Sequence, residues 1–497
     1  MTFFSKLFNR GAASNPFERI RAEIVGIDLH FDGPMGRKHV VYADWIASGR
    51  LYRPIEQKML EDFGPYTANT HTDSNVTGSM MTQAYEEAKN IIKKHVNAGP
   101  HDVLINTGTG MTGAVAKLQR ILGWKIPEQA AGRFTLDPAE RPVVFVTHVE
   151  HHSNQTSWME TICEVVIIPP DADGKTDLDA FANLLKQYES RPTLVAAVTA
   201  GSNVTGYIPP YYTIASMIHK AGGLCFVDFA CAAPYVNIDM HPANSDERLD
   251  AIFFSPHKFL GGPGTCGVLV FNDSLYKNRV PDIPGGGTVK WTNPWGQHLF
   301  LDDIEHREDG GTPPFLQTIR TALCLRLKES LGVENIQRRE KELLQMFFSA
   351  LDGVPGIHIL APNIRDRIGV FSLCIDGLHH NLGVKILNDR YGIQVRGGCS
   401  CAGTYGHYLL NMDRDFSEQM IQKILACEPT EKPGWIRISL HPVMTNQEAA
   451  YIIDAVLDLS RNHEEWKNDY VFDVNTNQFT HKNEQAHNPL RNWFSMQ

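Results

Sequence analysis

The chain has no long apolar run and no excess of basic residues. No stretch approaches the roughly 20 consecutive apolar residues that a membrane-spanning helix needs, so we expect no membrane association. The 46 Lys and Arg residues are outnumbered by 56 Asp and Glu residues, which gives a formal net charge of −10. Phosphate backbones bind basic surfaces, so nucleic acid is not expected as a partner. Residues 1–10 lack the continuous apolar core of a signal peptide, and we interpret them as part of a surface arm.

Cysteines are too few and too scattered for a disulfide framework. Nine cysteines in 497 residues are spread from Cys163 to Cys427, and only Cys399 and Cys401 lie close together. Small secreted domains are dense in disulfides, so this spacing predicts a reducing, cytoplasmic compartment. The adjacent His151 and His152 could be metal ligands or plain polar residues at a strand end, but we expect no metal site.

What the chain does have is a series of short apolar runs that alternate with helix-like segments. Residues 142–147, 194–199, 224–228 and 251–255 are typical of buried strands, and residues 213–223 are typical of a helix closed by glycine. This alternation predicts an α/β fold with a largely parallel sheet and crossover helices. Polar residues follow each run directly, and ligands gather at the carboxyl ends of such strands. We therefore expect these polar groups to converge at one edge of the sheet.

The composition divides the chain into four expected segments. An N-terminal arm, residues 1–40, precedes a large domain of residues 41–320. After a stretch rich in Pro and Gly, helix-like residues 318–331 and 333–351 lead into a smaller α+β domain, residues 321–461. Residues 462–497 are rich in Asn, His and charge, which predicts a polar tail that is disordered or wraps the surface. A partner-binding arm is the alternative for this tail.

Lys258 follows one of the apolar runs and precedes Gly261 and Gly262. A pyridoxal phosphate (PLP) enzyme needs such an amine for its Schiff base, and space for a flat ring beside it. Most lysines in glycine-rich loops are simply solvated, so this lysine is not diagnostic alone. Asp228 could keep the pyridine nitrogen of PLP protonated, although an Asp after a strand is more often a cap or turn residue. The two residues together favour a PLP site.

A glycine-rich segment precedes the helix-like residues 114–122. Gly108, Thr109 and Gly110 offer a hydroxyl and backbone N–H groups at a helix N-terminus, which is an arrangement that binds phosphate. A Gly-Thr-Gly sequence is an ordinary turn at least as often. The segment therefore indicates a phosphate site only in combination with Lys258 and Asp228.

Ordered motifs along the chain resemble those of one enzyme family. They are residues 41–44 (VYAD), 108–109 (GT), 150–154 (EHHSN), 202–206 (SNVTG), 227–228 (VD), 255–258 (SPHK), 285–287 (GGG), 311–313 (GTP) and 437–440 (RISL). From about Tyr42 to Leu457 the chain resembles the class V branch of the fold-type I PLP enzymes, and within it the cysteine desulfurases. The Cys399 and Cys401 pair also resembles the desulfurase-like domain of molybdenum cofactor sulfurases. The resemblance implies a large domain with a mostly parallel seven-stranded sheet flanked by helices, and a smaller α+β C-terminal domain.

The resemblance also implies a role for each matching residue. Lys258 carries the Schiff base, Asp228 contacts the pyridine nitrogen, and His151 stacks on the ring as a catalytic residue. The residues implied in phosphate binding are Thr109, Gly110, Ser255, His257 and Thr312. Of these, Thr312 would reach the phosphate of a neighbouring subunit, which implies a homodimer with shared active sites. The residues implied in substrate binding are Arg437, Arg396 and Asn203, and Asn203 would also contact the cofactor.

Cys401 matches the nucleophilic cysteine of the desulfurases. A thiolate on a mobile glycine-rich loop can reach the substrate sulfur and then swing out with a persulfide. The implied reaction converts L-cysteine to L-alanine and leaves a persulfide on Cys401 for a sulfur acceptor, for which a protein is one candidate. The alternatives for Cys401 are a redox or metal pair with Cys399, or a structural thiol.

Two departures from the family pattern leave other reactions open. Cys231 stands where many desulfurases have a Gln, and Gly110 replaces the second Thr of the phosphate loop. The alternative functions are a C–S lyase, a selenocysteine lyase, an epimerase or an aminotransferase of the same family. A non-catalytic binding protein with this fold is a further alternative, which intact Lys258, Asp228 and Arg437 disfavour.

Overall fold

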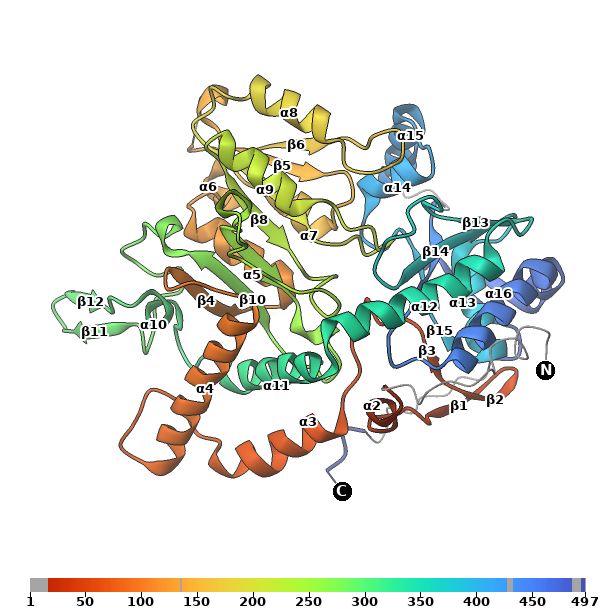
Figure 1. Ribbon diagram of the computed structural model, residues 1–497, viewed down its shortest axis with the longest axis horizontal. Helices are drawn as coiled ribbons and strands as arrows, with labels where there is room; N and C mark the ends of the chain where they lie inside the picture. The colour runs from red at the N-terminus through yellow and green to blue at the C-terminus, as the bar shows by residue number, and fades with distance from the viewer. Residues whose placement is uncertain (1–16, 135, 427–431, 485–492, 497) are drawn as a thin grey trace.

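A seven-stranded sheet forms the centre of the larger part of the chain (Figure 1). The computed structural model describes residues 17–134, 136–426, 432–484 and 493–496. Only β10 runs antiparallel to its neighbours, which confirms the predicted mostly parallel sheet. In spatial order the strands are β4 (Asp102–Thr107), β10 (Gly267–Asn272), β9 (Ala251–Phe254), β8 (Leu224–Asp228), β7 (Leu194–Thr199), β5 (Val143–Thr147) and β6 (Glu164–Ile168). The four apolar runs seen in the sequence are β5, β7, β8 and β9.

Helices cover both faces of this sheet because its strands are apolar on both sides. Along β5, Val143 and Phe145 belong to the apolar cluster that contains residues of α8 and α9, whereas Val144 and Val146 belong to the cluster of α5. Alternate residues of a strand point to opposite faces, so each strand contributes to both clusters. The longer helices of this part are α4 (Val76–His95), α5 (Gly110–Ile121), α7 (His152–Met159), α8 (Leu178–Gln187), α9 (Tyr211–Lys220) and α11 (Phe315–Leu331).

A second, antiparallel sheet lies beside the large one, as the predicted α+β region requires (Figure 1). Its order is β13 (Ile357–Ile359), β14 (Val370–Ile375), β17 (Trp435–Ser439) and β16 (Arg396–Gly398). The helices of this part are α12 (Val333–Leu351), α13 (His380–Tyr391), α14 (Gly403–Leu409), α15 (Arg414–Leu425) and α16 (Asn446–Trp466). The carboxyl end of β16 leads directly into the Cys399–Cys401 segment.

The expected boundary at residue 320 falls inside a continuous helix. Helix α11 packs on α4 of the large part, whereas α12 packs on α16 of the small part. Gly332 separates the two helices and has a φ of +77°, which suits glycine. The packing therefore changes at Gly332, about one helix later than the composition suggested.

Both terminal segments pack on the body of the protein where they are described. In the N-terminal arm, Arg21 forms an ion pair with Glu448 of α16 at 2.6 Å. After α16, the tail forms a hairpin of β18 (Tyr470–Asp473) and β19 (Gln478–His481). Rings of this hairpin contact His379 at the start of α13. Residues 470–481 of the tail thus form a hairpin that packs on the small part.

Short elements complete the structure. They are α2 (Glu18–Ala22), β1 (His30–Gly33), β2 (Gly36–His39), β3 (Val41–Tyr42), α3 (Arg53–Lys58), α6 (Glu128–Ala131), β11 (Val289–Thr292), β12 (His298–Phe300), α10 (Ile304–Glu308) and β15 (Ile393–Gln394). Strand β3 pairs in parallel with β15, which connects residues 41–42 to the small part. No helix among the described residues has the length and apolarity to cross a bilayer.

Candidate active site

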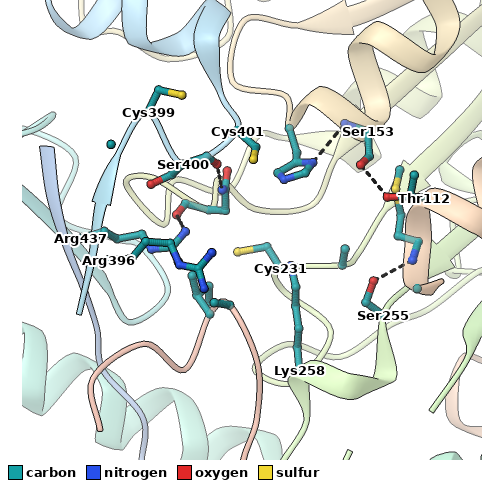
Figure 2. A pocket seen from close by; sticks show the side chains of 18 of the residues that line it. Thr112, Ser153, Cys231, Ser255, Lys258, Arg396, Cys399, Ser400, Cys401 and Arg437 are labelled. Atoms are coloured by element: carbon teal, nitrogen blue, oxygen red, sulfur yellow. Dashed lines mark hydrogen bonds between the residues drawn. The ribbon is translucent and has the colours of Figure 1, made fainter. Parts of the chain in front are cut away.

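A cavity of about 540 Å³ lies where the carboxyl ends of the large sheet meet the small part (Figure 2). The ends of β7 and β8, the segment after β9, the starts of α5 and α7, and β16 with the turn after it all contribute to its walls. This is the edge where the sequence predicted that polar groups would converge. The predicted site residues that line the cavity are Thr109, Gly110, His151, Asn203, Asp228, Ser255, His257, Lys258, Arg396, Cys401 and Arg437.

Lys258 and Asp228 enter the cavity from neighbouring strands. Lys258 ends the short 3-10 turn after β9, and Asp228 is the last residue of β8. Desolvation lowers the pKa of the Lys258 amine, and the nearby Cys231 and Asp228 partly offset this effect. Burial raises the pKa of Asp228 to about 6, against the opposing effects of the Ala230 N–H and Lys258. The neighbouring Ala230 N–H donates to the Asp228 carboxylate at 2.7 Å, which leaves the second oxygen for another donor.

The start of α5 and the segment after β9 meet at one end of the cavity. The Met111 N–H donates to Ser255 Oγ at 2.7 Å, so the helix N-terminus and Ser255 are joined. Gly110 has a φ of +60°, and a Cβ there would lie 2.7 Å from Ser255 Oγ. Only glycine fits this position without strain, because both its backbone conformation and its contact exclude a side chain. The N–H groups of a helix start suit an anion such as a phosphate.

His151 lies at the N-terminus of α7 and lines the same cavity. Its Nδ1 accepts from the Ser153 N–H at 3.1 Å, which orients the ring. Burial lowers the pKa of His151 to about 4, and the Lys258 charge acts in the same direction, so the ring is neutral. The preceding Glu150 is fully buried and accepts from the Thr199 N–H at 2.9 Å and from Asn154 Nδ2 at 2.8 Å. Glu150 therefore joins the ends of β5 and β7 to α7 beneath His151.

Two arginines and an aspartate form an ionic cluster on the small-part side. Arg396 of β16 and Arg437 of β17 are direct cross-strand partners, and Asp44 bridges them at 3.1 and 2.8 Å. Like charges opposite each other across a sheet repel, and the Asp44 carboxylate offsets that repulsion. The Arg437 side chain is buried and its Nε has no hydrogen-bond partner among the described residues. Asn203 Oδ1 is likewise buried without one. Both groups are available to a ligand.

Cys401 lies on an anchored turn rather than on a loose loop. The Ala402 N–H donates to Cys399 O at 3.0 Å, and Ser400 and Cys401 have φ values of +52° and +56°. These features are those of a type I′ turn, which disfavours side chains at both central positions. The His152 N–H donates to Cys401 O at 2.8 Å, and Asn203 Nδ2 donates to Ser400 O at 2.6 Å. The expected mobile loop is thus fastened to the large part at two points.

One predicted site residue lies elsewhere, and sequence reasoning passed over several others. Thr312 lines a separate cavity with Asn106 and Glu308 and is not in contact with the one around Lys258. Asp44 is the last residue of the motif at 41–44, and nothing in the sequence pairs it with the two arginines. His380 and Asn477 also line the main cavity. Asn477 comes from the C-terminal hairpin, so only tertiary packing brings it there.

The geometry fits the predicted cofactor. A buried lysine, a carboxylate with a free oxygen, a neutral histidine and a helix start with an adjacent hydroxyl surround one space. PLP requires an amine for its Schiff base, a carboxylate that keeps its ring nitrogen protonated, a side chain against its ring and hydrogen-bond donors for its phosphate. The cavity contains a group that can fill each of these roles. Cys231 also lines the cavity beside Lys258. Burial raises its pKa to about 12, so it is a neutral thiol.

Comparisons with known proteins find relatives over most of the chain. A family model described as aminotransferase class-V matches residues 41–452. A probable cysteine desulfurase of Staphylococcus aureus is 27% identical over 376 residues, which cover 75% of this chain and 85% of that protein. One from Halobacterium salinarum is 28% identical over 373 residues, which cover 74% and 83%.

Solved structures share the fold at lower sequence identity. The apo structure of a cysteine desulfurase from Thermococcus onnurineus NA1 matches with a TM-score of 0.72 and 23% identity, covering 91% of this chain and all of that one. The cysteine desulfurase CsdA of Escherichia coli matches with a TM-score of 0.68 and 21% identity, covering 90% and 98%.

Proposed function

The chain belongs to the class-V aminotransferase family, and from this premise we propose that it is a PLP-dependent cysteine desulfurase. The substrate is L-cysteine, the carbon product is L-alanine, and the sulfur is left as a persulfide on Cys401. The observation that carries this proposal is the position of Cys401, whose exposed thiol lines the same cavity as Lys258. Relatives described as probable cysteine desulfurases support it.

The substrate carboxylate is held by the ionic cluster. Arg437 Nη1 donates to Asn203 O at 3.2 Å and Nη2 to Asp44 at 2.8 Å, which holds the planar guanidinium, with its unpaired Nε, in place for a carboxylate. Asp44 already neutralises one of the two arginine charges, so the cluster accepts a single further anion.

Lys258 moves the proton at the substrate Cα. Desolvation lowers the pKa of its amine, which raises the share of neutral amine that can accept this proton. PLP, when bound, supplies the electron sink for bond cleavage at the substrate Cα. The Asp228 carboxylate lies at the buried end of the cavity, where it can keep the ring nitrogen of the cofactor protonated.

Cys401 takes the sulfur. Its thiolate attacks the substrate sulfur, and a sulfur–sulfur bond forms as the bond between substrate Cβ and sulfur breaks. The electron pair of the broken bond stays with the carbon fragment, which takes up a proton to complete alanine. The His152 N–H and Asn203 amide that hold the turn keep this thiol at the cavity. The outer sulfur of the persulfide then passes to an acceptor thiol. We also propose a homodimer in which Thr312 lies at the active site of the partner subunit.

Two variants test these roles separately. Lys258→Ala should lose both the yellow colour of the bound cofactor and all turnover. Cys401→Ala should keep the colour and lose persulfide formation. Pyruvate and ammonia in place of alanine would instead indicate a C–S lyase, and alanine with persulfide from the Cys401→Ala protein would refute the role of Cys401.

A further inference from the structure

Two free thiols flank the turn at the mouth of the cavity. Cys399 and Cys401 are both exposed, and both line the cavity that contains Lys258. In Figure 2, Cys401 lies above the space that Lys258 and Cys231 enter, and Cys399 lies on the far side of Ser400 from it. The two thiols therefore lie two residues apart on one turn, at the same cavity.

The turn resists the outward swing that would carry sulfur from Cys401 to solvent. Its two central residues have positive φ, and hydrogen bonds from His152 N and Asn203 Nδ2 hold its carbonyls. Helix α14 begins at Gly403, and the Gly403 N–H donates to His152 Nε2 at 2.9 Å. Only Ala402 separates Cys401 from this helix, so little chain is available for a swing. Cys401 therefore cannot move away from the cavity unless these contacts break.

We propose that Cys399 is a second sulfur carrier, which takes the sulfane sulfur from Cys401 and presents it at the surface. This inference rests on the proposed desulfurase function. The Cys399 thiolate attacks the outer sulfur of the Cys401 persulfide, and a new sulfur–sulfur bond forms on Cys399. The bond to Cys401 Sγ breaks and its electron pair leaves with the Cys401 thiolate. The Cys399 proton passes through solvent to Cys401, so no net oxidation or reduction occurs.

The other thiols of the described chain are unsuited to this role. Cys231 lines the cavity, but burial raises its pKa to about 12, so it has almost no thiolate. Cys374 is half-buried with its Sγ 3.7 Å from Gly434 O, and it does not line the cavity. Cys399 combines exposure with a place beside Cys401 on the same turn.

A pulse experiment on the cofactor-loaded protein tests the relay. The protein is mixed with L-cysteine, quenched with an alkylating agent after increasing times, and digested. Fragmentation of the peptide that contains both cysteines then locates the extra sulfur. The relay predicts that sulfur is found first on Cys401 and later on Cys399, and that in Cys399→Ser it stays on Cys401. Sulfur that never reaches Cys399 in the unmodified protein overturns the relay.

Acceptor size provides a second readout. A long polyethylene-glycol monothiol, too large to enter the cavity, should collect sulfur over many turnovers from the unmodified protein. With Cys399→Ser the large thiol should collect no sulfur, and turnover should stop once Cys401 carries its persulfide, whereas the small dithiothreitol should still reach Cys401 and restore it. Cys374→Ala is the matched control, because it removes a thiol outside the cavity. Equal transfer to the large thiol in Cys399→Ser and Cys374→Ala would refute the relay.

Alanine distinguishes failure of the relay from failure of the proposed function. An alanine burst in the unmodified protein with all sulfur retained on Cys401 leaves the desulfurase function intact and rejects the relay. Absence of an alanine burst rejects the function, and the relay is rejected with it.

Discussion

Replacement of Arg437 by lysine tests which arginine binds the substrate carboxylate. The Arg437 side chain is only 4% exposed, whereas that of Arg396 is 55% exposed. A hydrogen bond to a charged group contributes about 1.5–3 kcal/mol, and lysine cannot reproduce the planar guanidinium. At 1.4 kcal/mol per factor of ten, kcat/KM for L-cysteine should fall about 10- to 150-fold in Arg437→Lys. An exposed ion pair contributes about 0–1 kcal/mol, so Arg396→Lys should cost about fivefold at most.

Steady-state kinetics with L-cysteine measure both variants, and cofactor absorbance checks that the site is intact. Inhibition by cysteamine, which lacks the carboxylate, should change little in Arg437→Lys. The reasoning fails if Arg396→Lys lowers kcat/KM as much as Arg437→Lys does, or if cysteamine binding falls in parallel with that of L-cysteine.

Three further predictions concern the cofactor end of the cavity. Gly110→Ala should weaken PLP binding in a fluorescence titration. The control is Gly123→Ala, which should leave the affinity intact, because Gly123 has a similar positive φ but nothing within 4 Å of an added Cβ. Equal losses of affinity in both variants would exclude the contact with Ser255 as the cause. Burial raises the pKa of Asp228 to about 6, above the ordinary 3.9, so its protonated form is favoured by folding. The apo-protein should therefore lose stability as pH rises from about 4 through 6, and Asp228→Asn should remove this part of a pH series of denaturant unfolding. Because desolvation lowers the pKa of Lys258, the apo-protein should combine covalently with PLP at pH values below the ordinary lysine pKa of about 10.4, with an absorbance midpoint that reports the shift.

The sheet was predictable because its signal is local. Residues such as Val143–Thr147 and Leu224–Asp228 form apolar runs of strand length, and their strands appear as β5 and β8. Asp228 and Lys258 follow from the same logic, since ligands collect at the carboxyl ends of parallel strands. The expected boundary at residue 320 lies within α11 because composition changes before this helix ends, whereas packing changes at Gly332.

The features of the site that the sequence did not predict depend on tertiary contacts between distant segments. Asp44 acquires its role only when β3 pairs with β15 and brings its carboxylate to Arg396 and Arg437. Asn477 reaches the cavity because the tail hairpin packs on α13. The anchoring of the Cys401 turn likewise needs His152, which lies far away in sequence, so the Gly-rich composition alone suggested a mobile loop.

A single-turnover measurement tests the central claim most directly. The cofactor-loaded protein, mixed with limiting L-cysteine, should form alanine and protein-bound sulfane sulfur in equal amounts, and the sulfur should lie on the peptide that contains Cys401. Pyruvate and ammonia with no sulfur on that peptide would contradict the account.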